Sequence, residues 1–192
     1  MDQIDGLLGG NNVDRSRVLE WLDKIDQWDD VMFSYGHMDR HQALFLTKFK
    51  RRICVNRMAS SPALGEAYSS KLAQYQGLEQ EMQDGQSVHT ADQQLKKMLD
   101  AAEKQLESGV YLTGSEYSVA DACFVALLAR VEYLRLSDLI ASRPQVAEYF
   151  KRMKQRASYK KAIGWFGLGM TRALIFYPTL WGLRIRKMFK QF

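Results

Sequence analysis

The chain has 192 residues and 22.2 kDa, and its 46% hydrophobic and 26% charged residues are ordinary for a globular domain. This composition excludes wholesale disorder, which needs low hydrophobicity and high net charge. With two cysteines and three histidines, a disulfide framework is excluded and a metal site is not expected. The first residues contain neither the basic region nor the apolar region of a secretory signal, which favours a cytoplasmic location.

The net charge of +5 is distributed unevenly along the chain. Residues 1–150 sum to −6, whereas residues 151–192 hold eleven Lys and Arg, no acidic residue, and so a charge of +11. A basic block at the end of an acidic body usually indicates an anionic partner, either a nucleic acid or a membrane surface.

Most of the chain has a helical pattern. Residues 1–12 are rich in Gly and Asn and are predicted to be a linker. Apolar residues between positions 18 and 35 recur at spacings of three, four and seven, which predicts one helix of about six turns with Asp14 as its N-cap. Two further helical runs follow: one contains four cations between residues 48 and 52, and the other begins at Pro62.

Three more helices are predicted in the second half. Thr90 and Gln93 fit a capping box at the start of the fourth helix. A fifth helix, from Ser118 to about Leu136, is apolar almost all round and therefore belongs in the centre of a bundle. A sixth begins at Pro144. No alternating strand pattern appears, so the predicted fold class is all-α, a helical bundle with a central buried helix.

The most specific signal is the stretch YLTGSEYSVAD, which ends at Asp121. Ser118 is predicted to be the N-cap of the central helix, and Asp121 to accept a hydrogen bond from the Ser118 backbone amide, so that the two form a capping box. Because this helix is buried, its free amides cannot bond to water and a polar cap is required. Asp121 is therefore expected to fold the helix and to do no chemistry.

This stretch resembles the capping-box signature of the C-terminal domain of glutathione transferases, in which aromatic-Leu-x-Gly precedes Ser/Thr-x-Ala-Asp. The resemblance continues through residues 149–161, although Ala157 stands where the family often has Pro. Residues 46–68 are similar to the insertion of the plant tetrachlorohydroquinone-dehalogenase-like class, and ganglioside-induced differentiation-associated proteins carry a related one. The resemblance covers residues 13–164 and implies that family's helical bundle with an α-helical insertion at about residues 40–85.

The resemblance also implies a division of labour. In the family, a thioredoxin-like N-terminal domain binds and activates glutathione, and no such pattern occurs before residue 13. The chain therefore resembles the acceptor-binding half of an enzyme that conjugates glutathione or dehalogenates reductively when joined to that domain, and alone it is expected to be inactive. Glutathione would be the co-substrate of the complete enzyme, with no cofactor or catalytic residue in this chain and a homodimer as a further expectation. Cys54 and Cys123 fit buried, inert thiols.

A small hydrophobic or electrophilic substrate is the expected acceptor. In the family, its site is lined by the far end of the first helix and by the C-terminal tail. The corresponding positions here are Met32, Phe33, Tyr35, Trp165 and Phe166. Plain core packing is the alternative for any one of them.

Residues 165–192 form a basic, aromatic tail. Its proposed membrane-contacting residues are Arg172, Trp181, Arg184, Arg186, Lys187 and Lys190. This pattern suits an anionic membrane surface and gives the alternative function of a non-catalytic, membrane-associated scaffold. The tail could equally fold back over the acceptor site, whereas Pro178 and Arg172 weaken a spanning helix. The four cations between residues 48 and 52 point around most of their helix, which indicates a solvated face and no nucleic-acid partner.

Overall fold

The structure is a computed structural model that describes residues 14–163. Within this range the chain is helical and has no strand; a single bridge between Tyr111 and Gly114 closes a turn. The all-α class is therefore confirmed. The expected linker and the tail lie outside the described residues, and so do the tail residues named above. These are Trp165, Phe166, Arg172, Trp181, Arg184, Arg186, Lys187 and Lys190.

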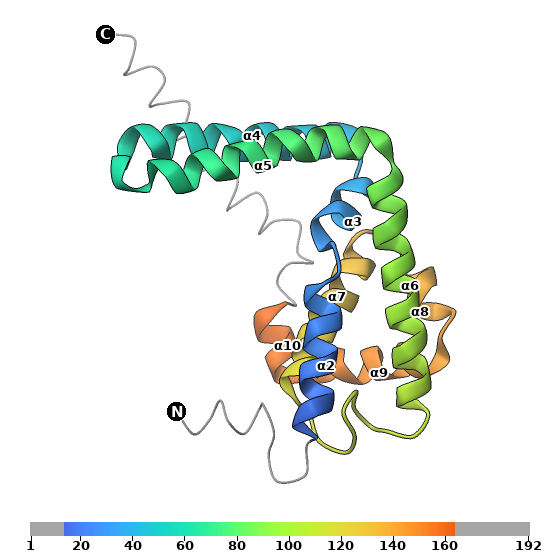
Figure 1. The fold of residues 1–192 in the computed structure, drawn as a ribbon. Coiled ribbons are helices and arrows are strands. Elements are labelled where there is room, and N and C mark those ends of the chain that lie inside the picture. The colour runs from blue at the N-terminus through green and yellow to red at the C-terminus, as the bar shows by residue number, and fades with distance from the viewer. Residues whose placement is uncertain (1–13, 164–192) are drawn as a thin grey trace.

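The helices divide into a bundle and a projecting arm (Figure 1). In chain order they are α2 (Arg15–Asp26), α3 (Asp30–Gly36), α4 (Arg40–Ser60), the 3₁₀ turn η1 (Pro62–Leu64), α5 (Gly65–Asp84), α6 (Gln86–Leu106), α7 (Val119–Tyr133), α8 (Asp138–Ala141), α9 (Pro144–Gln155) and α10 (Ala157–Ala162). The arm consists of α4 and α5, which pack side by side and project from the end of the bundle where α6 begins (Figure 1).

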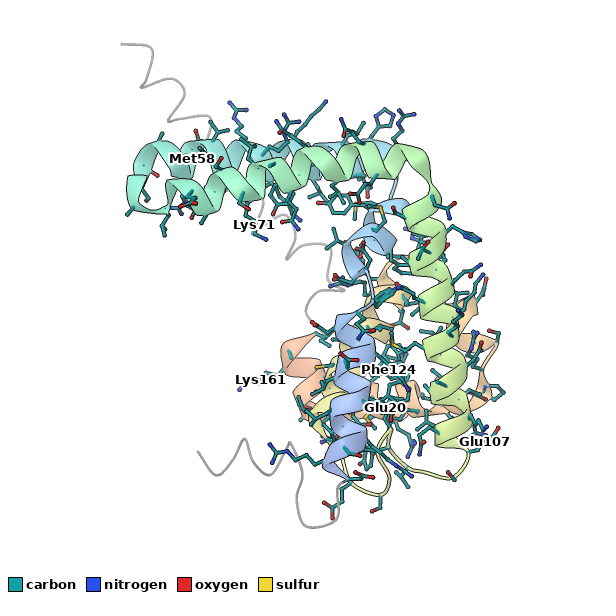
Figure 2. The ribbon with its side chains drawn as sticks, in the orientation of Figure 1. Glu20, Met58, Lys71, Glu107, Phe124 and Lys161 are labelled. Atoms are coloured by element: carbon teal, nitrogen blue, oxygen red, sulfur yellow. The ribbon has the colours of Figure 1, made fainter. Side chains whose placement is uncertain are left out.

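The bundle is built around α7, as its apolar sequence predicts. This helix packs against α2 and α9, and its Phe124 side chain is fully buried. The Phe124 ring lies 5.7 Å from the Trp21 ring and 6.2 Å from the Tyr149 ring, measured between centroids. Figure 2 shows Phe124 inside the bundle, between α2 and α6. These contacts explain why a helix with almost no charged face is stable here: its apolar surface is removed from water.

The first predicted helix is in fact two helices. Asp14 caps α2 as expected, but α2 ends at Asp26, and Asp29 caps α3 by accepting a hydrogen bond from the Met32 amide at 2.8 Å. Between them the buried Trp28 indole donates to the Ala91 carbonyl of α6 at 3.0 Å. This tertiary hydrogen bond stabilises the break between α2 and α3, although the apolar spacing in the sequence continues across it.

Two other helix ends differ from the prediction. The helix α6 begins four residues before Thr90, after Gly85 with a φ of 72°, and the Thr90 hydroxyl donates back to the Gln86 carbonyl; the predicted Thr90 capping box is wrong. The helix α7 ends before Leu136, because Arg135 adopts a φ of 63° and the last amides bond back into the helix in a Schellman pattern.

The arm coincides with the segment expected to be an insertion. A small buried cluster joins it to the bundle, formed by Met32 and Tyr35 of α3, Ala43 of α4 and Leu78 of α5. The Lys50 ammonium lies 5.3 Å from the centroid of the Tyr35 ring and so reinforces this junction. Among residues 14–163, no helix is both long and apolar enough to cross a bilayer.

Candidate functional site

The capping box at the start of α7 is confirmed. Ser118 is the N-cap in extended backbone, and its amide donates to the Asp121 carboxylate at 2.9 Å. The Ser118 hydroxyl donates to the same carboxylate oxygen at 2.9 Å. Both residues are fully buried, so these bonds satisfy polar groups that water does not reach.

Asp121 also reaches beyond its own helix. Its second carboxylate oxygen accepts hydrogen bonds from the Leu112 amide at 3.0 Å and from the Tyr149 hydroxyl at 2.9 Å. Burial, with the Asp121 charge next to it, raises the pKa of Tyr149 far above its usual range, so this phenol stays protonated and donates at all ordinary pH values. One carboxylate therefore ties the loop before α7 and the helix α9 to the start of the central helix.

An open groove of about 620 Å³ runs between α2 and α7. Its apolar walls are Leu19, Leu22, Ile25 and Trp28 on the α2 side, with Cys123, Ala126 and Leu127 on α7. Polar groups are few and stand at the rim. These are Asp23, Asp26, Asp30 and Arg130. The buried packing of α2 on α7 holds both walls in place, and the anchored start of α7 sets the position of the second wall.

The polar end of the groove is fixed by Arg130. Its guanidinium forms an ion pair with the Asp30 carboxylate and donates to the Asp30 carbonyl at 3.3 Å. Burial lowers the pKa of Arg130, but a guanidinium remains charged at neutral pH. About two turns earlier on the same helix, burial raises the pKa of the Cys123 thiol, so little reactive thiolate is present there. The groove can hold an apolar molecule, but it offers that molecule no activated nucleophile of its own.

The predicted acceptor residues lie elsewhere. Phe33 is buried in the bundle core between the Trp28 and His37 rings, 5.1 and 4.7 Å from their centroids. Met32 and Tyr35 are buried at the base of the arm. None of the three lines the groove, and a role for them in acceptor binding stays a prediction.

The sequence did not mark the groove-lining residues as a groove, because Leu22, Ile25 and Trp28 belong to an apolar stripe that was interpreted as core packing. Leu19 lies off that stripe, and the structure leaves it 51% exposed. Ala126 is exposed on a helix whose composition predicts full burial. Both become neighbours of the same groove only through the packing of α2 against α7.

The comparison with known families gives the class of domain to which this helical bundle, with its capping box at a buried central helix, belongs. Residues 38–157 match the family described as the glutathione S-transferase C-terminal domain. The chain therefore belongs to this family. The matched range contains the arm, the central helix and α9, and it begins after α2 and α3.

Two curated relatives show which members of the family the chain is similar to. The chain is 34% identical over 176 residues to glutathione S-transferase TCHQD of Arabidopsis thaliana, covering 91% of this chain and 66% of that protein. It is 29% identical over 153 residues to the tetrachloro-p-hydroquinone reductive dehalogenase of Sphingobium chlorophenolicum, covering 78% of this chain and 60% of that protein. The chain thus spans less than two thirds of the length of either relative. No solved structure matches it significantly.

Proposed function

We propose that the chain is the acceptor-binding helical half of a glutathione transferase, and that the groove between α2 and α7 holds the apolar part of an electrophilic substrate. The observation that carries this proposal is the groove itself: about 620 Å³, with apolar walls and a few polar groups at its rim, in a domain of this family. Sites for small molecules usually have this size and this composition.

The thiol chemistry is assigned to a partner domain. The Cys123 thiol beside the groove has a raised pKa, and Cys54 is buried in α4 away from the groove. A thioredoxin-like domain would therefore bind glutathione and activate its thiol, while α2 and α7 orient the acceptor against it. Conjugation or reductive dehalogenation would take place only where the two halves meet.

The proposed acceptor class is a compact, halogenated aromatic. The bacterial relative is named for the reductive dehalogenation of tetrachloro-p-hydroquinone, which makes that compound a reasonable ligand for the first binding test. Its ring and chlorine atoms would contact Leu22, Ile25 and Ala126, and its hydroxyls would face the polar rim.

Calorimetric titration of the full chain with tetrachlorohydroquinone under anaerobic conditions tests the proposal. Ala126→Phe places a ring inside the groove, and we expect the affinity to fall at least fivefold. Ala122→Phe is the matched control, because Ala122 is exposed on the same helix one turn earlier and does not line the groove. If both variants bind as the parent does, the groove is not the acceptor site.

Retention on glutathione resin tests whether glutathione binds to a separate thioredoxin-like domain and not to this chain. The chain alone is expected to pass through the resin, and retention that free glutathione releases would contradict the assignment of glutathione to a partner domain. The alternative of a non-catalytic membrane scaffold predicts no acceptor binding in the groove at all. Homodimer formation and a cytoplasmic location stay predictions.

A further inference from the structure

We propose that the outer face of α4 docks onto the surface of an anionic lipid membrane, so that the arm is a membrane-contacting element. Three observations carry this inference: the charge of α4, the alignment of its exposed residues, and the projection of the arm beyond the bundle (Figure 1). The proposal is independent of the acceptor groove, which lies in the bundle between α2 and α7.

The helix α4 is basic over its whole length. Between Arg40 and Ser60 it holds six Lys and Arg residues and no Asp or Glu. Its neighbour α5 is different, since it carries acidic residues that include Glu66 and Glu81. A helix with only one sign of charge gives the arm a positive side, and an anionic surface is attracted to that side.

Six of the exposed residues of α4 line up in one narrow stripe. Their spacing of three and four residues keeps them within about 80° around the helix axis and spreads them over about 27 Å along it. In chain order this outer stripe is His41, Phe45, Lys48, Arg52, Val55 and Ala59, all of them exposed. The basic pair Lys48 and Arg52 therefore lies between the apolar side chains of Phe45 and Val55 along a single accessible line.

The structure separates the four cations between residues 48 and 52. Lys50 turns inward, with its ammonium 5.3 and 5.5 Å from the centroids of the Tyr35 and Tyr75 rings. Lys48 and Arg52 point outward on the stripe, and neither forms an ion pair within residues 14–163. These two charges are thus available to lipid phosphates and do not serve the fold.

The apolar members of the stripe supply the second component of membrane binding. Phe45 is 50% exposed and Val55 is 53% exposed, and each lies about one helical turn from the nearer residue of the basic pair. Side chains of this kind enter the headgroup region while the neighbouring cations stay at the phosphates. Charge and apolar contact then act at the same place, as peripheral membrane binding requires.

A membrane fits these residues better than a nucleic acid does. Nucleic acids without sequence preference are bound in positive grooves whose aromatic rings stack on the bases. The stripe lies along the outside of a single helix, and the Phe45 ring is already stacked on Phe49, with centroids 6.2 Å apart and an interplanar angle of 10°. A convex, basic and apolar line matches a lipid surface.

Co-sedimentation of the full chain with vesicles tests the proposal. The vesicles contain phosphatidylcholine with 30% phosphatidylserine, and pure phosphatidylcholine vesicles are the neutral reference. The variant Lys48→Gln/Arg52→Gln is expected to bind the anionic vesicles roughly 25-fold more weakly, because each basic residue at such a surface contributes about fivefold to the affinity. The variant Lys96→Gln/Lys97→Gln has the same net charge but is altered on the exposed side of α6, and its affinity should change no more than twofold.

The apolar contact is tested separately. At 0.5 M NaCl, salt screens the attraction between charges, so most of the vesicle affinity that remains comes from apolar contact. Phe45→Ser/Val55→Asn should lower this remaining affinity at least fivefold. Circular dichroism melts establish that each variant is folded. Equal binding by the parent and by Lys48→Gln/Arg52→Gln would overturn the proposal and assign any vesicle binding to other cations. Binding of a 20-nucleotide RNA without any binding of anionic vesicles would overturn it in favour of a nucleic-acid surface.

Discussion

Asp121 is a fully buried carboxylate whose bonds join three segments of the chain. Its pairing with Ser118 could be predicted from the sequence, because a capping box is a local pattern with a fixed spacing. Its bond with Tyr149 could not, since the two residues are 28 positions apart. Tyr149 also occupies an apolar position in the pattern of α9, so nothing local in the sequence marks its hydroxyl as a donor to Asp121.

Replacing Asp121 with Ala is expected to lower the free energy of unfolding by about 3–4 kcal/mol. A lost helix cap alone costs about 1–2 kcal/mol, and here the Leu112 amide and the Tyr149 hydroxyl also lose their acceptor in a buried place. Urea denaturation followed by circular dichroism measures the change. Tyr149→Phe is the control, because it removes one donor and leaves the cap intact, at a cost of about 1 kcal/mol. Equal losses in the two variants would show that Asp121 is not the centre of this network.

The helices were easier to predict than their ends. Apolar spacing located most of them, and the uncharged sequence of α7 placed it correctly at the centre of the bundle. The break between α2 and α3 escaped prediction because the hydrogen bond from Trp28 to α6 is tertiary and the apolar pattern continues across it. The turn between α9 and α10 forms without the Pro that the family often has at position 157. Arg156 there adopts φ −63° and ψ 139°, which is the backbone that a following Pro would favour.

Replacement of glycine by alanine is expected to have opposite effects at Gly36, where α3 packs closely on α6, and at Gly77, where there is open space. A Cβ at Gly36 would lie 2.5 and 2.6 Å from the methyl carbons of Val88, whereas a Cβ at Gly77, inside α5, would meet no atom within 4 Å. Gly36→Ala should therefore destabilise the protein by about 1–2 kcal/mol, because the β-branched Val88 has little freedom to move. Gly77→Ala should stabilise it by about 0.5–1 kcal/mol through helix propensity.

Thermal and urea denaturation of the two glycine variants gives these free energies directly. Because the amino-acid change is the same, any general effect of adding a methyl group cancels between them. A stabilising effect at both positions would mean that α3 and α6 do not approach each other as closely as the structure shows.

At the scale of the whole molecule, the fold and the candidate site differ in how well the sequence predicts them. The family fold was recognised from a local motif, and the family match over residues 38–157 confirms it. The groove depends on two helices about 100 residues apart in the chain, and its walls include exposed or half-buried residues that no periodic pattern singles out. The expected acceptor residues on α3 are buried in the core or at the base of the arm.

The central claim is that the groove between α2 and α7 receives the acceptor. Its most direct test is a titration of the ¹⁵N-labelled full chain with tetrachlorohydroquinone, followed by nuclear magnetic resonance at each backbone amide. We expect the largest chemical-shift changes at the groove residues Leu22, Ile25 and Ala126. Changes concentrated instead around Met32 and Tyr35, or no saturable change at millimolar ligand, would contradict the claim.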